Sequence, residues 1–148
     1  MSETDSFETT GTTAHKAGIG RRLAALFYDW LLVFSLLFFA TAILLPFTGG
    51  HEIEPGNPLY TAYAAYLTGL SYVYFGLSWT RGGQTLGMRA WQIKALSTDG
   101  TALDWRQSLV RFASAFAGLG LLGMVLSPSG NAWHDTLSNS VTIALTKK

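Results

Sequence analysis

The residue with the clearest potential for chemistry is an aspartate inside an apolar run. From Leu23 to Leu45 the chain is apolar over the length of a membrane span, yet Asp29 lies within it. A carboxylate near the middle of a transmembrane helix costs about 3 kcal/mol on insertion scales, so it usually faces a bundle interior or a wet cavity. Asp29 is therefore a candidate proton or cation site.

Arg22 precedes Asp29 by seven residues, which returns it to nearly the same face of a helix. Helical side chains lean toward the N-terminus and an arginine stem can extend, so we expect a direct or water-bridged pair between them. Such a pair exchanges a proton for a cation, or it is a buried contact that fixes helix packing. Taken alone, Arg22 is also a topology anchor at the membrane surface.

The composition is typical of an integral membrane protein. Of the 148 residues, 49% are hydrophobic and 13% are charged, against about a quarter charged in soluble domains. Asp, Glu, Lys and Arg are absent from residues 30–51, 55–80 and 112–134, and each stretch can hold the roughly 20 residues that cross a bilayer. The net charge of +1 gives no indication of a nucleic-acid partner, and the absence of cysteine excludes disulfides and thiolate chemistry.

We predict an all-α integral membrane protein with two firm transmembrane helices, at about residues 19–46 and 59–79. Pro46 and the following glycine pair end the first helical pattern, and a short acidic loop leads to the second. The third apolar segment, 107–126, is interrupted by glycines. It is predicted to be either a Gly-rich third span or a re-entrant helix.

The first 18 residues are polar, Thr-rich and acidic, without the basic start and apolar core of a signal peptide. We expect residues 1–18 to form a disordered tail and residues 19–146 to form the transmembrane domain. Lys16, Arg21 and Arg22 flank the first span on its N-terminal side, whereas the next loop carries no basic residue. Positive charge marks the cytoplasmic side, so the N-terminus is predicted to be cytoplasmic.

A short cytoplasmic β-hairpin is expected in the connector after the second helix. Ala90 to Leu96 alternates apolar and polar residues, and the Asp99-Gly100 pair is a turn signal. Val141 to Leu145 also alternates. That stretch is an alternative partner for Ala90 to Leu96, provided that both lie on the cytoplasmic side.

Tyr63 and Tyr66 share one face of the second helix. The simpler interpretation is that they pack against the first helix, while the aromatic residues at the helix ends lie at the membrane interfaces. The alternative is that one of the two hydroxyls donates to Asp29.

The connector also contains GGQTLGMR, bounded by Arg81 and Arg89. Backbone amides and a guanidinium in this segment are able to cradle an anion. The alternative is that the glycines turn the chain off the second helix while Arg81 and Arg89 contact anionic lipid headgroups.

His134 and Asp135 form a second candidate pair, because histidine changes its charge near neutral pH. The alternative is that Asp135 caps or turns the chain after the third segment. Two ligands adjacent in sequence make poor metal geometry, so neither a metal site nor a cofactor is expected. We find no enzyme signature.

The order of these features resembles the RDD family of bacterial membrane proteins. An arginine opens the first helix, an aspartate lies inside it, GQTLGMRAWQIK follows the second helix, and WHD comes late in the chain. The family's arginine and two aspartates would fall on Arg22, Asp29 and Asp135. The resemblance implies a location in the bacterial inner membrane and transport of an unidentified ligand.

Two functions follow from these patterns. The first is transport of an ion or small solute, with Asp29 coupled to Arg22 and Asp135 as a cation or proton site. Two helices cannot enclose a transport pathway, so transport would need a homo-oligomer. The second is a non-enzymatic assembly or accessory module in which the same charges stabilise helix packing beside a membrane partner protein. The lipid bilayer is a partner in both.

Overall fold

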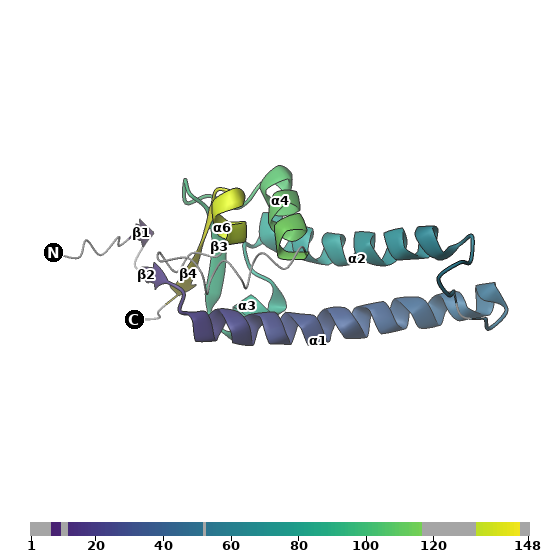
Figure 1. Ribbon diagram of the computed structural model, residues 1–148. Coiled ribbons are helices and arrows are strands. Elements are labelled where there is room, and N and C mark those ends of the chain that lie inside the picture. The colour runs from purple at the N-terminus through teal and green to yellow at the C-terminus, as the bar shows by residue number, and fades with distance from the viewer. Residues whose placement is uncertain (1–6, 10–11, 52, 117–132, 146–148) are drawn as a thin grey trace.

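The computed structural model describes residues 7–9, 12–51, 53–116 and 133–145. Its framework is a pair of long antiparallel helices, α1 (Ile19–Leu44) and α2 (Tyr60–Arg81), with the 3-10 helix η1 (Leu45–Thr48) after α1 (Figure 1). The remaining described elements gather where α1 begins and α2 ends. We call that end of the helix pair the sheet end, and the opposite end, with η1 and the following loop, the loop end.

A four-stranded antiparallel sheet lies at the sheet end, in the order β1-β2-β4-β3. Its strands are β1 (Phe7–Thr9), β2 (Thr12–Lys16), β3 (Ile93–Ser97) and β4 (Ser140–Leu145). Three further helices surround it: α3 (Leu86–Ala90), α4 (Trp105–Phe116) and α6 (Trp133–Leu137). The molecule is mostly helical, but its sheet is larger than the hairpin predicted from the sequence.

α1 is continuous because nothing before Pro46 breaks its apolar run, and Pro46 then lies in the first turn of η1. Gly49 ends η1 with a φ of 65°, a left-handed conformation that glycine adopts without strain. Within the described residues, one helical stretch is long and apolar enough to cross a membrane: Ile19–Thr48, which contains an 18-residue window with a mean hydropathy of 2.4. α2 is long enough, but its tyrosine, threonine, serine and glycine residues lower its hydropathy.

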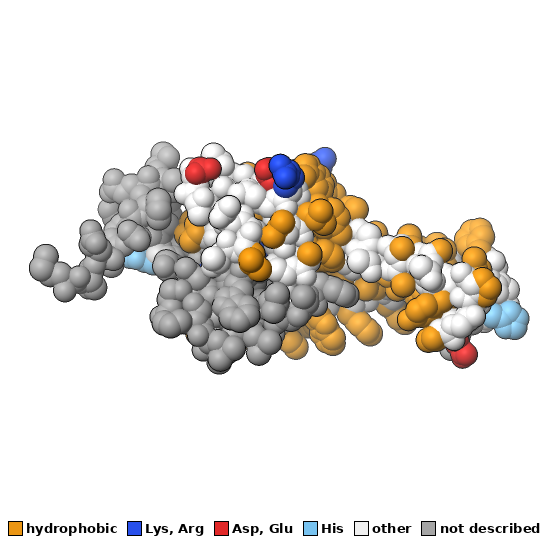
Figure 2. Space-filling model, turned by 45° about the horizontal axis from the view of Figure 1, so that its top comes forward, with side chains coloured by type: hydrophobic (Ala, Val, Ile, Leu, Met, Phe, Trp, Pro, Cys, Tyr) orange, Lys and Arg blue, Asp and Glu red, His pale blue; other side chains and the backbone are white. Residues whose placement is uncertain are grey.

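Large apolar side chains cover the outside of the helix pair (Figure 2). On α1 the exposed ones include Phe27, Trp30, Phe34, Phe38 and Phe39. Water-soluble monomers rarely expose a continuous apolar surface of this kind. The exposed face of α1 is therefore suited to contact with lipid.

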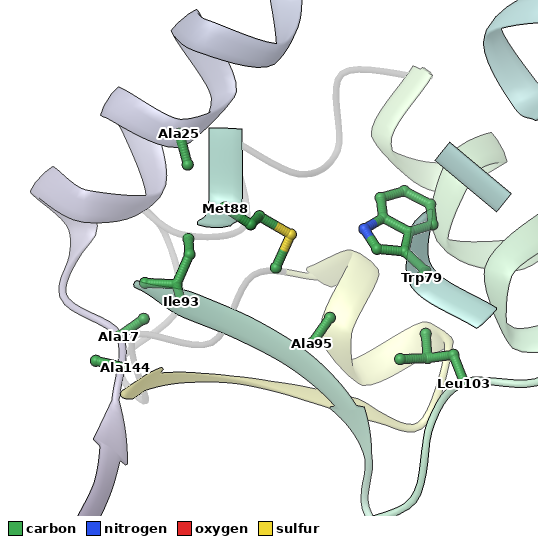
Figure 3. Packing of buried hydrophobic residues seen from close by; sticks show 8 residues of the cluster. All are labelled: Ala17, Ala25, Trp79, Met88, Ile93, Ala95, Leu103 and Ala144. Carbon is green, nitrogen blue, oxygen red and sulfur yellow. The ribbon is translucent and has the colours of Figure 1, made fainter. Parts of the chain in front are cut away.

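The buried hydrophobic core is small and lies at the sheet end, between α1, α2 and the sheet (Figure 3). Its members come from segments that are far apart in the chain, and the largest is the indole of Trp79. The cluster comprises Ala17, Ala25, Trp79, Met88, Ile93, Ala95, Leu103 and Ala144. Four of these eight residues are alanines, whose small side chains let the helices and strands approach closely.

The local β-hairpin predicted around Asp99-Gly100 is wrong. β3 pairs with β4, with Ile93 opposite Ala144 and Ser97 opposite Ser140. The chain does turn at Gly100, whose amide donates to the carbonyl of Ser97 at 2.9 Å, but it continues into α4. The alternating C-terminal stretch supplies the partner strand instead.

The disordered-tail prediction for residues 1–18 is wrong for residues 7–9 and 12–16. β2 pairs with β4, and the amide of Ala17 donates to the carbonyl of Thr142 at 3.1 Å. β4 has a second edge beyond β3, and residues 14–16 of β2 occupy it, with Ala14 opposite Leu145. Of the predicted third segment, α4 covers 105–116, and whether residues 117–126 cross or re-enter lies outside the described residues.

The register of β3 against β4 can be tested by crosslinking. Leu96 lies opposite Val141, and directly opposed antiparallel residues have Cα atoms about 4.5–5.5 Å apart, within disulfide reach. We expect Leu96→Cys with Val141→Cys to form an intramolecular disulfide on oxidation, detected by mass spectrometry of the linked peptides. The chain has no other cysteine to compete.

Leu96→Cys with Leu145→Cys is the matched control, because residue 145 lies four positions, or about 13 Å, farther along the same strand face. Equal crosslinking of the two pairs would contradict this register.

Candidate functional site

Asp135, in α6, lies between two arginines and is only 3% exposed. Its Oδ2 accepts a hydrogen bond from Nη1 of Arg22 at 2.8 Å, and its Oδ1 accepts one from Nη1 of Arg111. The hydroxyl of Thr142 lies 3.1 Å from Oδ1 and also donates to the carboxylate. We call Arg22, Asp135 and Arg111 the Arg-Asp-Arg cluster. Its single carboxylate connects α1, α4, α6 and β4.

Both arginines also donate to backbone or hydroxyl oxygens, although Nε of Arg111 has no hydrogen-bond partner among the described residues. Arg22 donates from Nε to the carbonyl of Ala17 and from Nη2 to that of Thr142, both at 3.1 Å. Arg111 donates from Nη1 to Oγ of Ser140 at 2.7 Å and from Nη2 to Oγ1 of Thr142 at 3.0 Å. Its guanidinium also lies 5.2 Å from the ring centroid of Trp79, a cation-π contact. Each arginine therefore binds the sheet as well as Asp135.

The predicted pair between Arg22 and Asp29 is wrong. Arg22 leans toward the N-terminus of α1, as helical side chains do, and there it meets Asp135 and the carbonyls beside the sheet. Asp29 lies two turns farther along α1 and has other partners. Spacing along one helix could not reveal a carboxylate that arrives 113 residues later in the chain.

Asp29 is also 3% exposed, and its oxygens accept three hydrogen bonds. Oδ1 accepts from the hydroxyl of Tyr74 and from the amide of Gly87, both at 2.9 Å. Oδ2 accepts from the hydroxyl of Thr85. Asp29 thus links α1 to α2 and to the first turn of α3. Among the described residues, no lysine or arginine forms an ion pair with it.

The contacts of Asp29 explain why the GGQTLGMR segment has a threonine at position 85 and a glycine at position 87. The Thr85 hydroxyl donates to Asp29 while accepting the amide of Met88 at 3.1 Å, which caps α3. At Gly87 a Cβ would lie 2.3 Å from the carbonyl oxygen of Ala25 and 2.8 Å from Cγ of Asp29, so only glycine fits. The anion that this segment cradles in the structure is the carboxylate of Asp29. Arg81 and Arg89 are exposed, and their contact with lipid or another anion stays a prediction.

Neither tyrosine singled out in the sequence is the partner of Asp29. The Tyr63 hydroxyl forms a 2.7 Å hydrogen bond with the Thr41 hydroxyl, and Tyr66 is exposed. Tyr74 takes that place because the helices are antiparallel. Asp29 lies fifteen residues before the end of α1, and Tyr74 lies fourteen residues after the start of α2, so they are level. Counting residues in both directions from the loop between the two helices would therefore have identified Tyr74 as the residue level with Asp29.

His134 lies in α6 beside Asp135, but its side chain is outside the described residues. The proposed titrating pair therefore stays a prediction. Among the described residues, no three histidine, aspartate or glutamate side chains are grouped to hold a metal ion.

A cavity of about 350 Å³ lies at the loop end, away from both aspartates. It is lined by Thr41, Leu44, Leu45, Thr48, His51, Ile53 and Tyr63. The buried carboxylates therefore have no part in this cavity.

Four buried charges balance in the described residues: Arg22 and Arg111 against Asp29 and Asp135. Removing a charge from water costs several kcal/mol, which only close partners offset. All four make hydrogen bonds within the protein. The arrangement is suited to joining elements that are distant in sequence.

Several of these partners were not identified as site residues from the sequence. In the sequence, Arg111 immediately precedes the charge-free stretch 112–134, and Thr142 is a polar position in the alternating stretch from Val141 to Leu145. A buried arginine in a lipid-facing chain requires an acidic partner, and that rule, applied to Arg111, would have pointed to Asp135.

Comparison with known families gave one match. A model of the RDD family matches residues 16–139, a range that contains Arg22, Asp29 and Asp135. Neither a search of curated proteins nor a search of solved structures gave a match.

Gly87→Ala should destabilise the protein by about 1–3 kcal/mol, because the added methyl group has no space between α3 and α1. Gly69→Ala is the matched control, since nothing lies within 4 Å of a Cβ there and alanine favours a helix. Thermal unfolding in detergent, followed by circular dichroism, measures both variants. A Gly87→Ala variant as stable as wild type would show that α3 does not lie this close to α1.

Asp135→Asn should destabilise the protein by about 3–5 kcal/mol, because it leaves two buried arginines without a counter-charge. Chemical denaturation in mild detergent measures the loss. The control is Asp104→Asn, at an exposed residue that accepts the amide of Gln107 and whose capping role asparagine can keep. Equal stability of the two variants would contradict the role given to the Arg-Asp-Arg cluster.

Proposed function

Because the chain belongs to the RDD family, whose domains are membrane-associated, we propose that it is a non-enzymatic integral membrane module. In this proposal α1 and α2 cross the inner membrane of a bacterium as a helical hairpin. The sheet end then forms a compact cytoplasmic head, and the lipid-facing helices are the surface for a second copy or a membrane partner protein.

The dimensions of α2 support a second crossing. Its 22 residues make a helix about 33 Å long, against a hydrocarbon core of about 30 Å. It runs antiparallel to α1, and the Thr41–Tyr63 hydrogen bond joins the two helices near the loop end. Paired polar groups of this kind are tolerated inside a bilayer, so the low hydropathy of α2 is compatible with a span.

Exposed charges support the orientation. Four exposed arginines lie at the ends of elements near the sheet end: Arg21, Arg81, Arg89 and Arg106. The loop end carries exposed Glu54 and no arginine or lysine. The positive-inside rule then favours a cytoplasmic sheet end, with the N-terminus on the same side.

One observation carries the proposal that the module is structural. Both family aspartates use their two carboxylate oxygens to join separate elements: Asp135 connects α6 to α1, α4 and β4, and Asp29 connects α1 to α2 and α3. Breaking either set would leave buried donors without acceptors, at about 1–3 kcal/mol each. In this proposal, the arginine and aspartates of the family stabilise the packing of the helices and the sheet against one another.

A second candidate is exchange of a proton or small cation at Asp29. It is favoured by the absence, among the described residues, of an ion-pair partner for this buried carboxylate, since such groups commonly mark ion pathways. Hydroxyls of Tyr74 and Thr85 lie beside it and can serve as oxygen ligands. Exchange would require these contacts and that of Gly87 to open.

Asp29→Asn distinguishes the two candidates. The asparagine oxygen can accept from Tyr74 and Gly87, while its amide donates to the free lone pair of Thr85. For a structural module we expect only modestly lower expression, and no dye-reported proton or cation flux in proteoliposomes from wild type or variant. Asp29→Leu removes both acceptor oxygens, and with them all three hydrogen bonds, and should lower expression strongly.

The control variant is Asp99→Asn, at an exposed turn position where asparagine is equally suitable. Wild-type flux that Asp29→Asn loses at equal folding, and that Asp99→Asn keeps, would overturn the structural proposal and establish exchange at Asp29.

A further inference from the structure

The polarity of α4 is reversed relative to an amphipathic helix of a soluble protein. Its most buried residues are polar: Ser108 is 0% exposed and Arg111 is 4% exposed, while Phe112 packs partly buried against the core. Its large outward residues, apart from Arg106, are apolar: Trp105, Leu109 and Val110 are 50%, 52% and 43% exposed. A helix surrounded by water places its apolar stripe inward. The reversed pattern indicates that the medium outside α4 is apolar.

α4 is held firmly against α2, so its outer face has a fixed position. A Cβ at Gly76 would lie 2.9 Å from Cζ3 of Trp105, which shows how closely the helices approach. The Tyr72 hydroxyl donates to the carbonyl of Trp105 at 3.2 Å, and the ring of Phe112 lies 5.5 Å from that of Tyr72. The outer face of α4 therefore lies beside α2, whose Tyr66 and Val73 are also exposed.

The charges beside this face fit a membrane surface. Arg106 is exposed next to Trp105 in the first turn of α4, and Arg81 is exposed at the end of the neighbouring α2. Exposed basic residues are attracted to the negative surface of an anionic leaflet. Tryptophan favours the boundary between headgroups and acyl chains. Apolar and basic residues therefore occur together as they do in interfacial helices.

We propose that the outer face of α4 docks into the headgroup–acyl boundary of an anionic bilayer leaflet. Trp105, Leu109 and Val110 contact acyl chains, and Arg106 contacts lipid phosphates. The inference rests on the proposed membrane hairpin and adds that the head is partly submerged. Because the same helix carries Arg111, one face of α4 binds lipid while the other completes the Arg-Asp-Arg cluster.

The test uses environment-sensitive fluorophores on single cysteines, which the cysteine-free chain allows without other substitutions. NBD is attached to Val110→Cys, to Phe34→Cys on the exposed face of α1, and to exposed Thr98→Cys beyond β3. The labelled full chain is reconstituted into vesicles of phosphatidylethanolamine and phosphatidylglycerol. Lipids carrying a nitroxide near the carbonyl or near the chain end report the depth of each label.

We expect the label at residue 110 to emit at shorter wavelength than that at residue 98 and to be quenched best by the shallow nitroxide. The label at residue 34 should be quenched best by the deep nitroxide. Lipid quenching at 34 with a water-like signal at 110 overturns the inference but leaves the hairpin intact. Absence of lipid quenching at 34 overturns the hairpin itself.

A second copy of the chain is the competing occupant of this face. In that case the label at residue 110 would be shielded from both water and lipid nitroxides. Val110→Cys would also form a disulfide-linked dimer on mild oxidation, whereas Thr98→Cys would not. That combination would overturn lipid docking.

Discussion

The structure depends on one carboxylate shared by two buried arginines. Asp135 is worth little as an isolated contact, because the cost of burying three charged groups offsets much of their attraction. Its importance is geometric. The apolar core of the sheet end is built mostly from alanines and single larger side chains, so it cannot by itself specify how the sheet meets the helices. Directional hydrogen bonds from Arg22 and Arg111 supply that orientation, and each side chain also binds the backbone or hydroxyls of β4.

Asp29 applies the same principle on a smaller scale. It has hydroxyl and amide donors where Asp135 has guanidinium donors, and it fixes a five-residue helix to the side of α1. The requirement for glycine at position 87 follows from this contact, since the backbone of α3 must approach within reach of a short side chain. A short, glycine-containing connector is thereby given one position relative to the helix pair.

Local patterns predicted the long elements well, because hydropathy and helix breakers act within one segment. Both ends of α1, at residue 19 and near Pro46, could be predicted from the local sequence alone. The partners of the charged residues were harder to predict, since they depend on which distant segments meet. Arg22 and Asp29 share a helix face, yet each binds a residue from another element. The pairing of β3 with β4 was one of two alternatives open in the sequence, and only the tertiary structure selects between them.

The sheet order has a consequence for biogenesis. β4 lies between β2 and β3, so neither of those strands can pair with it until residues 140–145 have been translated. α1 and α2 are complete much earlier. During synthesis, Arg22 and Arg111 thus lack their acidic partner until Asp135 emerges from the ribosome, more than 20 residues after Arg111. The sheet end therefore closes only after α6 and β4 have been made.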